Sequence, residues 1–244
     1  MSATMIHLIT QPGHWIEGEA VRQLEGLARL AGVVRAVGLP DLHPGRGYPI
    51  GAAVVSEGFV HPPRHTAAFG AEHIPGAINI GLRGQFASWA GTLIESDREI
   101  LIVADNELQA NEAVMRLAGV GLENVEGALV DVMGWRDSGR DVSRLPQMSV
   151  DELRGALAGM QVLDVRRRAE YDSGHVPGAI NIPLDVLPDH LDDIDTARPL
   201  AVICASGYRS STAASLLLRR HTTQPLVNVT GGTSAWIAAG YETE

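Results

Sequence analysis

Residues 200–210 read Leu200-Ala-Val-Ile-Cys-Ala-Ser-Gly-Tyr-Arg-Ser210, an apolar run that passes directly into a turn of small and polar residues. Four apolar residues in succession, followed by turn residues, predict a short buried strand. The stretch 211–219 that comes next is amphipathic at helical spacing and predicts a helix. A buried strand that leads through a tight turn into a helix is typical of α/β proteins with parallel sheets, so this stretch indicates the fold class.

The surrounding sequence continues this alternation and predicts a complete α/β unit over 143–244. Ser149 is placed to cap a helix, and Glu152, three residues later, completes a capping box. Further elements are expected as strands at 162–165 and 226–229, one or two short helices within 183–194, and a last helix over 233–239. The apolar run 200–203 is expected at the centre of a parallel sheet that is flanked by helices.

An octapeptide occurs twice, as His73-Ile-Pro-Gly-Ala-Ile-Asn-Ile80 and as His175-Val-Pro-Gly-Ala-Ile-Asn-Ile182. Each copy is followed in the same order by an apolar run, a helical stretch, an Asn-Val pair, a Trp and a Gly, which indicates an internal repeat. The earlier copy shows no counterpart of the strand at 162–165. The Pro- and His-rich stretch 59–65 occupies that place and is interpreted as a junction. We therefore predict an N-terminal segment at 1–65, a truncated copy at 66–142 and a complete copy at 143–244.

The turn after the central apolar run holds Cys204, the one cysteine of the chain. Backbone N–H groups in such a turn, at the N-terminus of a helix, form a cradle for an anion and lower the pKa of a thiol. Gly207 lets the turn curl tightly, Arg209 adds a cation with forked donors, and Ser210 or Ser211 is expected to cap the helix. An isolated cysteine at a strand end is usually a buried structural residue. Gly, Arg and Ser at these spacings favour a functional thiol instead.

The composition excludes several classes of function. The chain has 29 acidic residues against 19 arginines and no lysine, which removes Schiff-base, phosphate-loop and nucleophilic lysines. The formal charge of −10 argues against nucleic acids and anionic membranes as partners. A single cysteine allows no intramolecular disulfide. Since no apolar run approaches the ~20 residues of a membrane span and no signal peptide is recognisable, we expect a soluble cytoplasmic protein.

The stretch from about 148 to 243 resembles a complete rhodanese domain. The resemblance is carried by Val162-Leu-Asp-Val-Arg166, Glu170-Tyr171, Gly174-His-Val-Pro-Gly-Ala-Ile-Asn181, Cys204-Ala-Ser-Gly-Tyr-Arg-Ser210, and Gly231-Gly232 before Trp236. It implies a sulfurtransferase whose Cys204 thiolate attacks the sulfane sulfur of a donor such as thiosulfate and becomes a persulfide. Cyanide, a thiol or a protein then accepts the sulfur, and no cofactor is implied.

The same resemblance assigns roles within the loop. The backbone amides of Ala205, Ser206, Gly207, Tyr208 and Arg209 are expected to cradle the persulfide, and Arg209 to help bind the donor anion. Related phosphatases and arsenate reductases have a longer loop between the Cys and the Arg that holds a tetrahedral oxyanion. Four residues separate Cys204 from Arg209 here, which is typical of the shorter, sulfur-transfer loop.

Other conspicuous residues of the complete copy are interpreted as structural. Asp164, Arg166 and Glu170 are expected to form an ion-pair network that fixes the end of a strand, rather than to contact substrate. His175 and Asn181 are expected to hold turn geometry, and Trp236 to lie in the core.

The earlier copy is expected to be inactive. Alignment of the helices places Ala104 opposite Cys204 and Gln109 opposite Arg209, so the copy has neither the thiol nor the cation. Its stretch 81–91 is similar to the inactive first rhodanese of proteins that carry a persulfide dioxygenase ahead of two rhodanese modules. The metal-binding signature of that dioxygenase is absent, so its activity is not expected here.

The N-terminal segment differs from both copies. Residues 15–20, 19–30 and 39–53 resemble the N-terminus of an RtcB-type RNA ligase, in which Asp41 would support the active site. The catalytic residues of that family do not follow, so ligase activity is not expected. No metal site is expected among His43, His61, His65 and His73, since Pro62-Pro63 prevents a helix between the second and third. Helix 19–30 with 33–37, or the run 52–55, is expected to cover the sheet edge left by the missing strand.

Two other classes of function stay open on this evidence. The chain could be a rhodanese pair that binds a partner without catalysis, or a rearranged remnant with little activity. An RNA-processing role would require nucleotide or Mn²⁺ binding by the N-terminal segment, and neither is expected.

Overall fold

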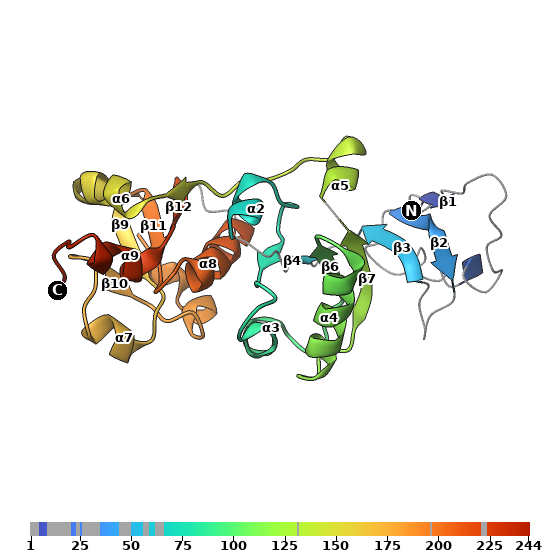
Figure 1. Ribbon diagram of the computed structural model, residues 1–244, viewed down its shortest axis with the longest axis horizontal. Coiled ribbons are helices and arrows are strands. Elements are labelled where there is room, and N and C mark those ends of the chain that lie inside the picture. Colours follow the sequence, from blue (N-terminus) through green and yellow to red (C-terminus); the bar gives the residue numbers. More distant parts are fainter. Residues whose placement is uncertain are drawn as a thin grey trace.

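The computed structural model describes residues 5–8, 21–22, 25, 35–43, 50–55, 59–61, 66–130, 132–195, 197–220 and 224–244. In this part of the chain three β-sheets follow one another along the long axis of the molecule (Figure 1). We call residues 147–244 the C-terminal unit and residues 59–137 the middle unit, because each range contains one of the sheets and its helices.

The sheet of the C-terminal unit is parallel throughout its described strands. They are β8 (Gln147–Met148), β9 (Gln161–Asp164), β10 (Ile180–Asn181), β11 (Leu200–Ile203) and β12 (Leu226–Val229). Their order is β10-β9-β11-β12-β8, with β11 in the centre. The predicted α/β class and the central place of the apolar run are confirmed. A central strand that is covered on both faces accommodates a continuous apolar run.

Helices flank this sheet as predicted. They are α6 (Val150–Ala156), α7 (Arg168–Asp172), α8 (Tyr208–Arg219) and α9 (Gly232–Ala238). Ser149 and Glu152 form the expected capping box at the start of α6. The short helices expected within 183–194 are the 3-10 turns η2 (Leu187–Asp189) and η3 (Leu191–Asp193), and a further 3-10 turn, η1 (Leu157–Gly159), follows α6.

The two faces of β11 enter different cores. Leu200 and Val202 belong to the cluster that contains Ala213, Ala214 and Leu217 of α8. Ala201 and Ile203, together with Trp236 of α9, belong to the cluster on the other face of the sheet. The alternation follows the period of two along a strand. Trp236 is 2% exposed, which confirms its predicted core position.

The middle unit repeats this design on a smaller scale. Its strands are β4 (Phe59–His61), β5 (Ile78–Asn79), β6 (Ile100–Ala104) and β7 (Val125–Val130), in the order β5-β4-β6-β7 and all parallel. Its helices are α2 (Thr66–Ala71), α3 (Phe86–Leu93), α4 (Glu107–Ala118) and α5 (Met133–Asp137).

One prediction about this unit is wrong. The stretch interpreted as a junction contains β4, which pairs with β5 and β6 as β9 pairs with β10 and β11. A three-residue strand that ends at Pro62-Pro63 is too short to show a strand pattern, yet prolines just beyond a strand end are compatible with it. The described sheet instead lacks a counterpart of β8, next to β7.

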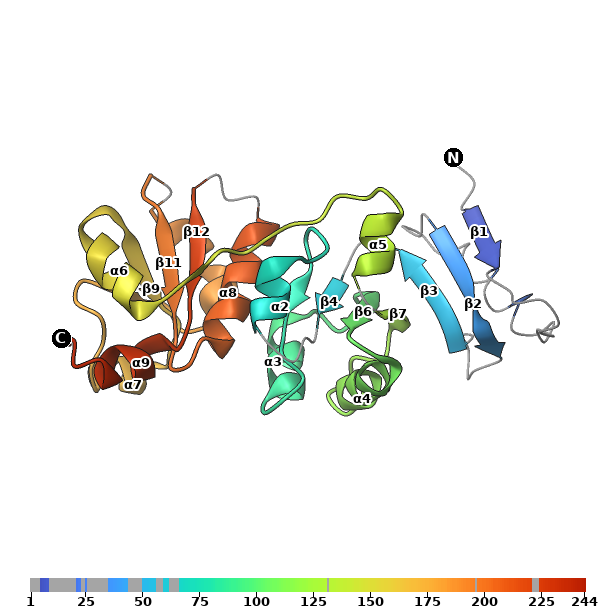
Figure 2. The ribbon, with the colours of Figure 1, turned by 45° about the horizontal axis from the view of Figure 1, so that its top comes forward.

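A separate sheet lies at that edge. Its described strands are β1 (Met5–Leu8), β2 (Arg35–His43) and β3 (Ile50–Val55), with β1 parallel and β3 antiparallel to β2. β3 lies beside β7 in both ribbon views (Figure 2). The run 52–55 therefore lies at a sheet edge, but not at the edge where the missing strand was predicted. Most of the predicted helix 19–30 lies outside the described residues.

The two larger units share one core through α8. Hydrophobic residues of both sheets join in a single cluster, and α8 packs against β5 of the middle unit as well as against β11 and β12. Asn79 in β5 donates from its backbone N–H to Ser215 Oγ (2.9 Å) and from Nδ2 to Ser211 Oγ (2.6 Å). Both hydroxyls lie on α8, so polar contacts between buried groups also connect the units.

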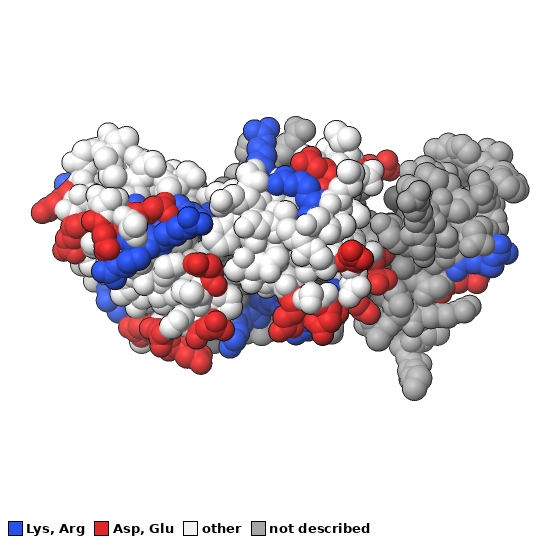
Figure 3. Space-filling view, turned by 90° about the horizontal axis from the view of Figure 1, so that it is seen from below, with Lys and Arg blue, Asp and Glu red and all other residues white. Residues whose placement is uncertain are grey.

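None of the helices in the described part of the chain has the length and hydropathy to cross a membrane. On the face in Figure 3, described arginines lie among acidic side chains.

The start of α9 provides a test of backbone packing. Gly232 has a φ of +59°, and a Cβ at this position would lie 2.2 Å from the Cys204 carbonyl oxygen. Gly178 has a similar φ of +72°, but a Cβ there would meet nothing within 4 Å. Gly178→Ala should therefore cost about 1–2 kcal/mol of unfolding free energy through backbone strain alone. Gly232→Ala should cost clearly more, because the backbone at Cys204 must also shift.

Urea unfolding of the two variants measures this difference. Equal losses of stability in Gly178→Ala and Gly232→Ala would contradict the close approach of α9 to the Cys204 backbone.

Candidate active site

The Cys204 loop, residues 204–207, connects the end of β11 to the start of α8. Gly207 has a φ of +95° and is the N-cap residue, so it supplies the left-handed conformation that the tight curl needs. Its N–H donates to Cys204 Sγ at 3.2 Å. The sulfur thus lies at the N-terminus of a 12-residue helix, where unpaired N–H groups and the helix dipole favour negative charge.

The predicted caps of this helix are wrong. α8 begins at Tyr208 rather than after Ser210 or Ser211, and no side chain caps it. Both serines lie buried in its first turn, and Ser211 Oγ accepts the hydrogen bond from Asn79. A glycine at the N-cap leaves the first N–H groups of the helix facing the loop.

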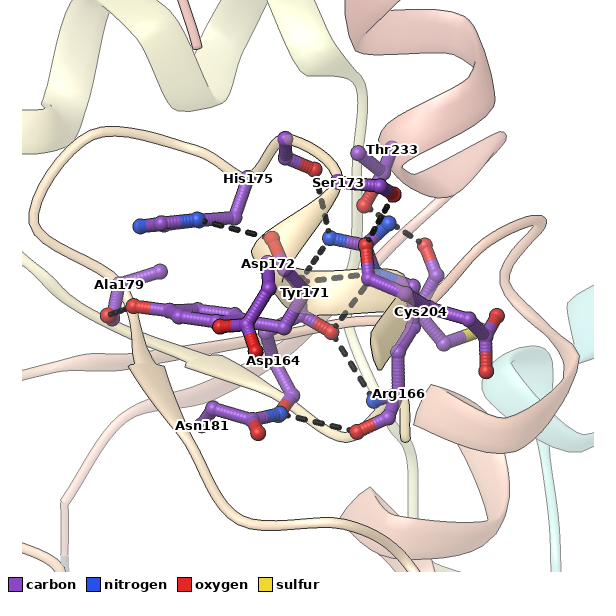
Figure 4. Close-up of polar contacts among 12 residues, drawn as sticks. Asp164, Arg166, Tyr171, Asp172, Ser173, His175, Ala179, Asn181, Cys204 and Thr233 are labelled. Carbon is purple, nitrogen blue, oxygen red and sulfur yellow. Dashed lines mark hydrogen bonds and ion pairs between the residues drawn. The ribbon is translucent and has the colours of Figure 1, made fainter. Parts of the chain in front are cut away.

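The start of α9 is hydrogen-bonded to the backbone of the Cys204 loop. Thr233 donates to the Cys204 carbonyl from its N–H (2.8 Å) and from Oγ1 (3.2 Å), and Ser234 N–H donates to the Ala205 carbonyl (3.0 Å). Figure 4 shows Thr233 beside Cys204. This role of Thr233 and Ser234 was not predicted from the sequence. The Gly231-Gly232 pair before them was the available signal, since only glycine permits the approach at Gly232.

A buried ion pair fixes the end of β9, as predicted. Arg166 binds Asp164 through Nε and Nη2 at 2.7–3.0 Å and also donates to the Gly174 carbonyl. Asn181 Nδ2 donates to the carbonyls of Asp164 and Arg166, both at 2.9 Å (Figure 4). His175 bonds the Tyr171 carbonyl. The structural interpretation of His175 and Asn181 is consistent with these contacts.

Glu170 does not join that pair as predicted. Its carboxylate binds Arg209 instead, with Nη1 to Oε2 at 2.7 Å and Nη2 to Oε1 at 2.6 Å. The hydrogen bonds from Arg209 lower the pKa of Glu170 to about 2, and those to Glu170 raise the pKa of Arg209. Spacing in sequence favoured Arg166 as partner, whereas the fold brings α7 next to the start of α8. A bidentate pair therefore connects α7 to Arg209, the second residue of α8.

Tyr208 reaches across to the middle unit. Its hydroxyl donates to the carbonyls of Gly81 and Arg83, the latter at 3.2 Å. Burial raises its pKa to about 12. The sequence predicted a role for the Tyr208 backbone only, since the distance in sequence to Gly81 gives no sign of a contact.

The corresponding position in the middle unit has a different form. Ala104 ends β6, and only residues 105 and 106 separate it from α4. Asn106 caps this helix by accepting from Gln109 N–H at 3.0 Å. The Asn106 side chain thus occupies the N-terminus of α4. In the C-terminal unit the Cys204 sulfur lies at the corresponding N-terminus of α8.

Among the described residues, no group of three potential metal ligands comes together. His73 is buried and stacks on Phe69, and its Nδ1 lies 2.8 Å from the Phe69 carbonyl oxygen. Burial lowers the pKa of His73. His65 and the side chains of His43 and His61 lie outside the described residues.

Comparison with known proteins gives two kinds of match. RNA-splicing ligase RtcB2 of Escherichia coli is 58% identical over 48 residues, which are 20% of this chain and 13% of that protein. The putative uncharacterized protein YkfJ of Escherichia coli is 58% identical over 50 residues, 20% of this chain and 57% of its own length. The chain thus spans little more than half of YkfJ and a small part of RtcB2. A partial likeness to RtcB is confirmed.

Further matches are to rhodanese-related proteins. A family model described as Rhodanese-like domain matches residues 149–239. Thiosulfate sulfurtransferase GlpE of Shewanella oneidensis is 30% identical over 97 residues, 39% of this chain and 95% of that protein. The crystal structure of a rhodanese-related protein from Thermoplasma volcanium is 31% identical, with 41% of this chain and 97% of that chain covered and a TM-score of 0.39. The chain therefore belongs to the rhodanese family.

Proposed function

We propose that the chain moves sulfane sulfur from an anionic donor such as thiosulfate to a thiophilic acceptor, with Cys204 as carrier. Membership in the rhodanese family and the sulfurtransferases among its relatives support a role of this general kind. The observation that carries the specific proposal is the hydrogen bond from Gly207 N–H to Cys204 Sγ at the start of α8. A backbone donor aimed at the sulfur favours its anionic forms, thiolate and persulfide.

The reaction takes two displacements at sulfur. The Cys204 thiolate attacks the sulfane sulfur of thiosulfate, a new S–S bond forms, and the old S–S bond breaks so that sulfite leaves with its electron pair. An acceptor such as cyanide then attacks the outer sulfur of the persulfide. Thiocyanate leaves and the thiolate returns, so no net oxidant or reductant is needed.

The loop provides what each step requires. In this proposal the N–H groups of Ala205, Ser206, Gly207, Tyr208 and Arg209 surround the terminal sulfur of the persulfide and stabilise its charge. The pair between Arg209 and Glu170 holds the end of the loop in place. Arg209 adds positive potential that favours binding of a donor anion. The negative charge of Glu170 reduces this potential.

The middle unit supplies no nucleophile in this proposal, since the one cysteine of the chain is Cys204. It is a truncated copy in which Ala104 stands where the thiol would be and Asn106 caps the following helix. A thiol, a cyanide ion or a protein thiol serves as the acceptor. The competing hypothesis is a pair that binds a partner without transferring sulfur, and the following experiment separates the two.

Incubation of the full chain with thiosulfate should add the mass of one sulfur atom to Cys204, and cyanide should then remove it as thiocyanate. Cys204→Ser should lower thiocyanate formation by at least about a thousandfold, because the variant has no nucleophile. Its urea unfolding midpoint serves as the control for folding. If both proteins form thiocyanate at the same rate, or if the wild type takes up no sulfur, the enzyme proposal fails and a binding role is favoured.

The Glu170–Arg209 pair predicts a pH-dependent part of stability. The pKa of Glu170 is about 2 in the folded chain against an ordinary value of 4.5, so the folded state binds its proton less readily than the unfolded state. The stabilisation is therefore fully present above pH 4.5 and is lost as the pH falls through 4.5 toward 2.

Urea unfolding of the wild type and Glu170→Gln measures this effect. The wild type should be more stable above pH 4.5, and the difference should shrink steadily below it. Glu123→Gln, at an exposed position, is the matched control and should show no such trend. A wild-type advantage that is constant between pH 6 and pH 3 would contradict the pairing.

A further inference from the structure

The middle unit forms a fixed contact with the loop that carries the proposed nucleophile. Tyr208 directly follows the Cys204 loop, and its hydroxyl donates to the carbonyls of Gly81 and Arg83. Its ring packs so closely on Gly81 that a Cβ there would lie 2.5 Å from the ring carbon Cε2. The segment 81–84 of the middle unit is therefore in direct contact with the end of the loop.

A second interaction holds segment 81–84 in place from its own side. Arg116 of α4 donates from Nη1 to the Leu82 carbonyl and from Nη2 to the Gly84 carbonyl, the latter at 2.8 Å. Its guanidinium also lies over the Phe86 ring, 5.4 Å from the centroid. The backbone of segment 81–84 thus has donors bound at 81, 82, 83 and 84, and its position relative to Tyr208 is well defined.

The arginines near the Cys204 loop differ in whether a carboxylate pairs with them. Arg209 is bound by the Glu170 carboxylate and Arg166 by the Asp164 carboxylate, each through two nitrogens. Arg83 is exposed, and no ion pair joins its side chain to an acidic residue within the described part of the chain. It therefore brings an uncompensated positive charge to the segment that contacts Tyr208.

We propose that Arg83 of the middle unit binds the oxyanion group of the sulfur donor while the donor's sulfane sulfur meets Cys204. This inference rests on the proposed function and adds a specificity-determining residue to it. A guanidinium binds two oxygens of a sulfonate-type group at once, which orients the donor as well as attracting it. Tyr208 is then a positioning residue, since its contacts fix segment 81–84 relative to the loop.

The kinetic test compares variants of the full chain in the reaction of thiosulfate with cyanide. Arg83→Ala should raise the KM for thiosulfate about five- to tenfold, and Arg83→Lys should restore part of the loss. The kcat should stay within about twofold, because Arg83 contacts an oxyanion that is bound before and during the reaction. The KM for cyanide, which is mostly uncharged HCN at neutral pH, should not change.

Arg98→Ala is the matched control. Arg98 is an exposed arginine of the same unit that pairs with Glu95, and its loss should leave the KM for thiosulfate unchanged. Tyr208→Phe removes the hydroxyl that holds segment 81–84 and should raise the same KM as Arg83→Ala does. Equal KM values for wild type and Arg83→Ala, or equal increases in Arg83→Ala and Arg98→Ala, would overturn the proposal.

A second measurement separates this inference from the proposed function. Alkylation of Cys204, the one cysteine, is followed by mass with iodoacetate, an anion, and with neutral iodoacetamide. Arg83→Ala should lower the ratio of the iodoacetate rate to the iodoacetamide rate severalfold, and Arg98→Ala should not. If the ratio falls but wild type transfers no sulfur, the anion site stands and the sulfurtransferase proposal fails. An unchanged ratio, or a thiol inert to both reagents, overturns the assignment of Arg83.

Discussion

Helix α8 packs against the sheets of both larger units at the same time, and most other features of these units depend on this. One side of it packs on β11 and β12, and another packs on β5 of the middle unit. The Gly207 N–H at its N-cap donates to Cys204 Sγ, so any shift of the helix moves this donor relative to the sulfur. The small residues Ala213 and Ala214 allow both sheets to approach closely, and the buried hydroxyls of Ser211 and Ser215 find a partner in Asn79.

The repeated octapeptide shows how one sequence serves two purposes. In the C-terminal unit the Asn181 side chain donates hydrogen bonds to the carbonyls of Asp164 and Arg166 at the end of β9. In the middle unit the corresponding Asn79 side chain donates to Ser211 Oγ on α8 of the C-terminal unit. The backbone conformation is alike, with Gly76 and Gly178 both at positive φ, so the difference lies in what surrounds the asparagine. The middle unit, which contains no cysteine, thus still has a structural role in the proposed enzyme.

The elements that sequence reasoning predicted best are those determined by local patterns. The run 200–203, the capping box at Ser149 and the left-handed turn at Gly207 each follow from neighbouring residues. The errors concern interactions between distant segments. β4 is too short to show a pattern and forms because β5 and β6 pair with it on both sides. The partners of Glu170 and Tyr208 lie 39 and more than 120 residues away, and no local spacing indicates them.

The hydrogen bonds from α9 to the Cys204 loop determine how the peptide groups of the loop are oriented. Thr233 and Ser234 bind the carbonyl oxygens of Cys204 and Ala205 on the α9 side. In a planar trans peptide the next N–H points in the opposite direction, so the N–H groups of Ala205 and Ser206 point away from α9. A rotation of either peptide, which would turn an oxygen toward the sulfur, has to break these hydrogen bonds first. The orientation of these two peptides is therefore fixed by α9, and binding of the proposed donor need not change it.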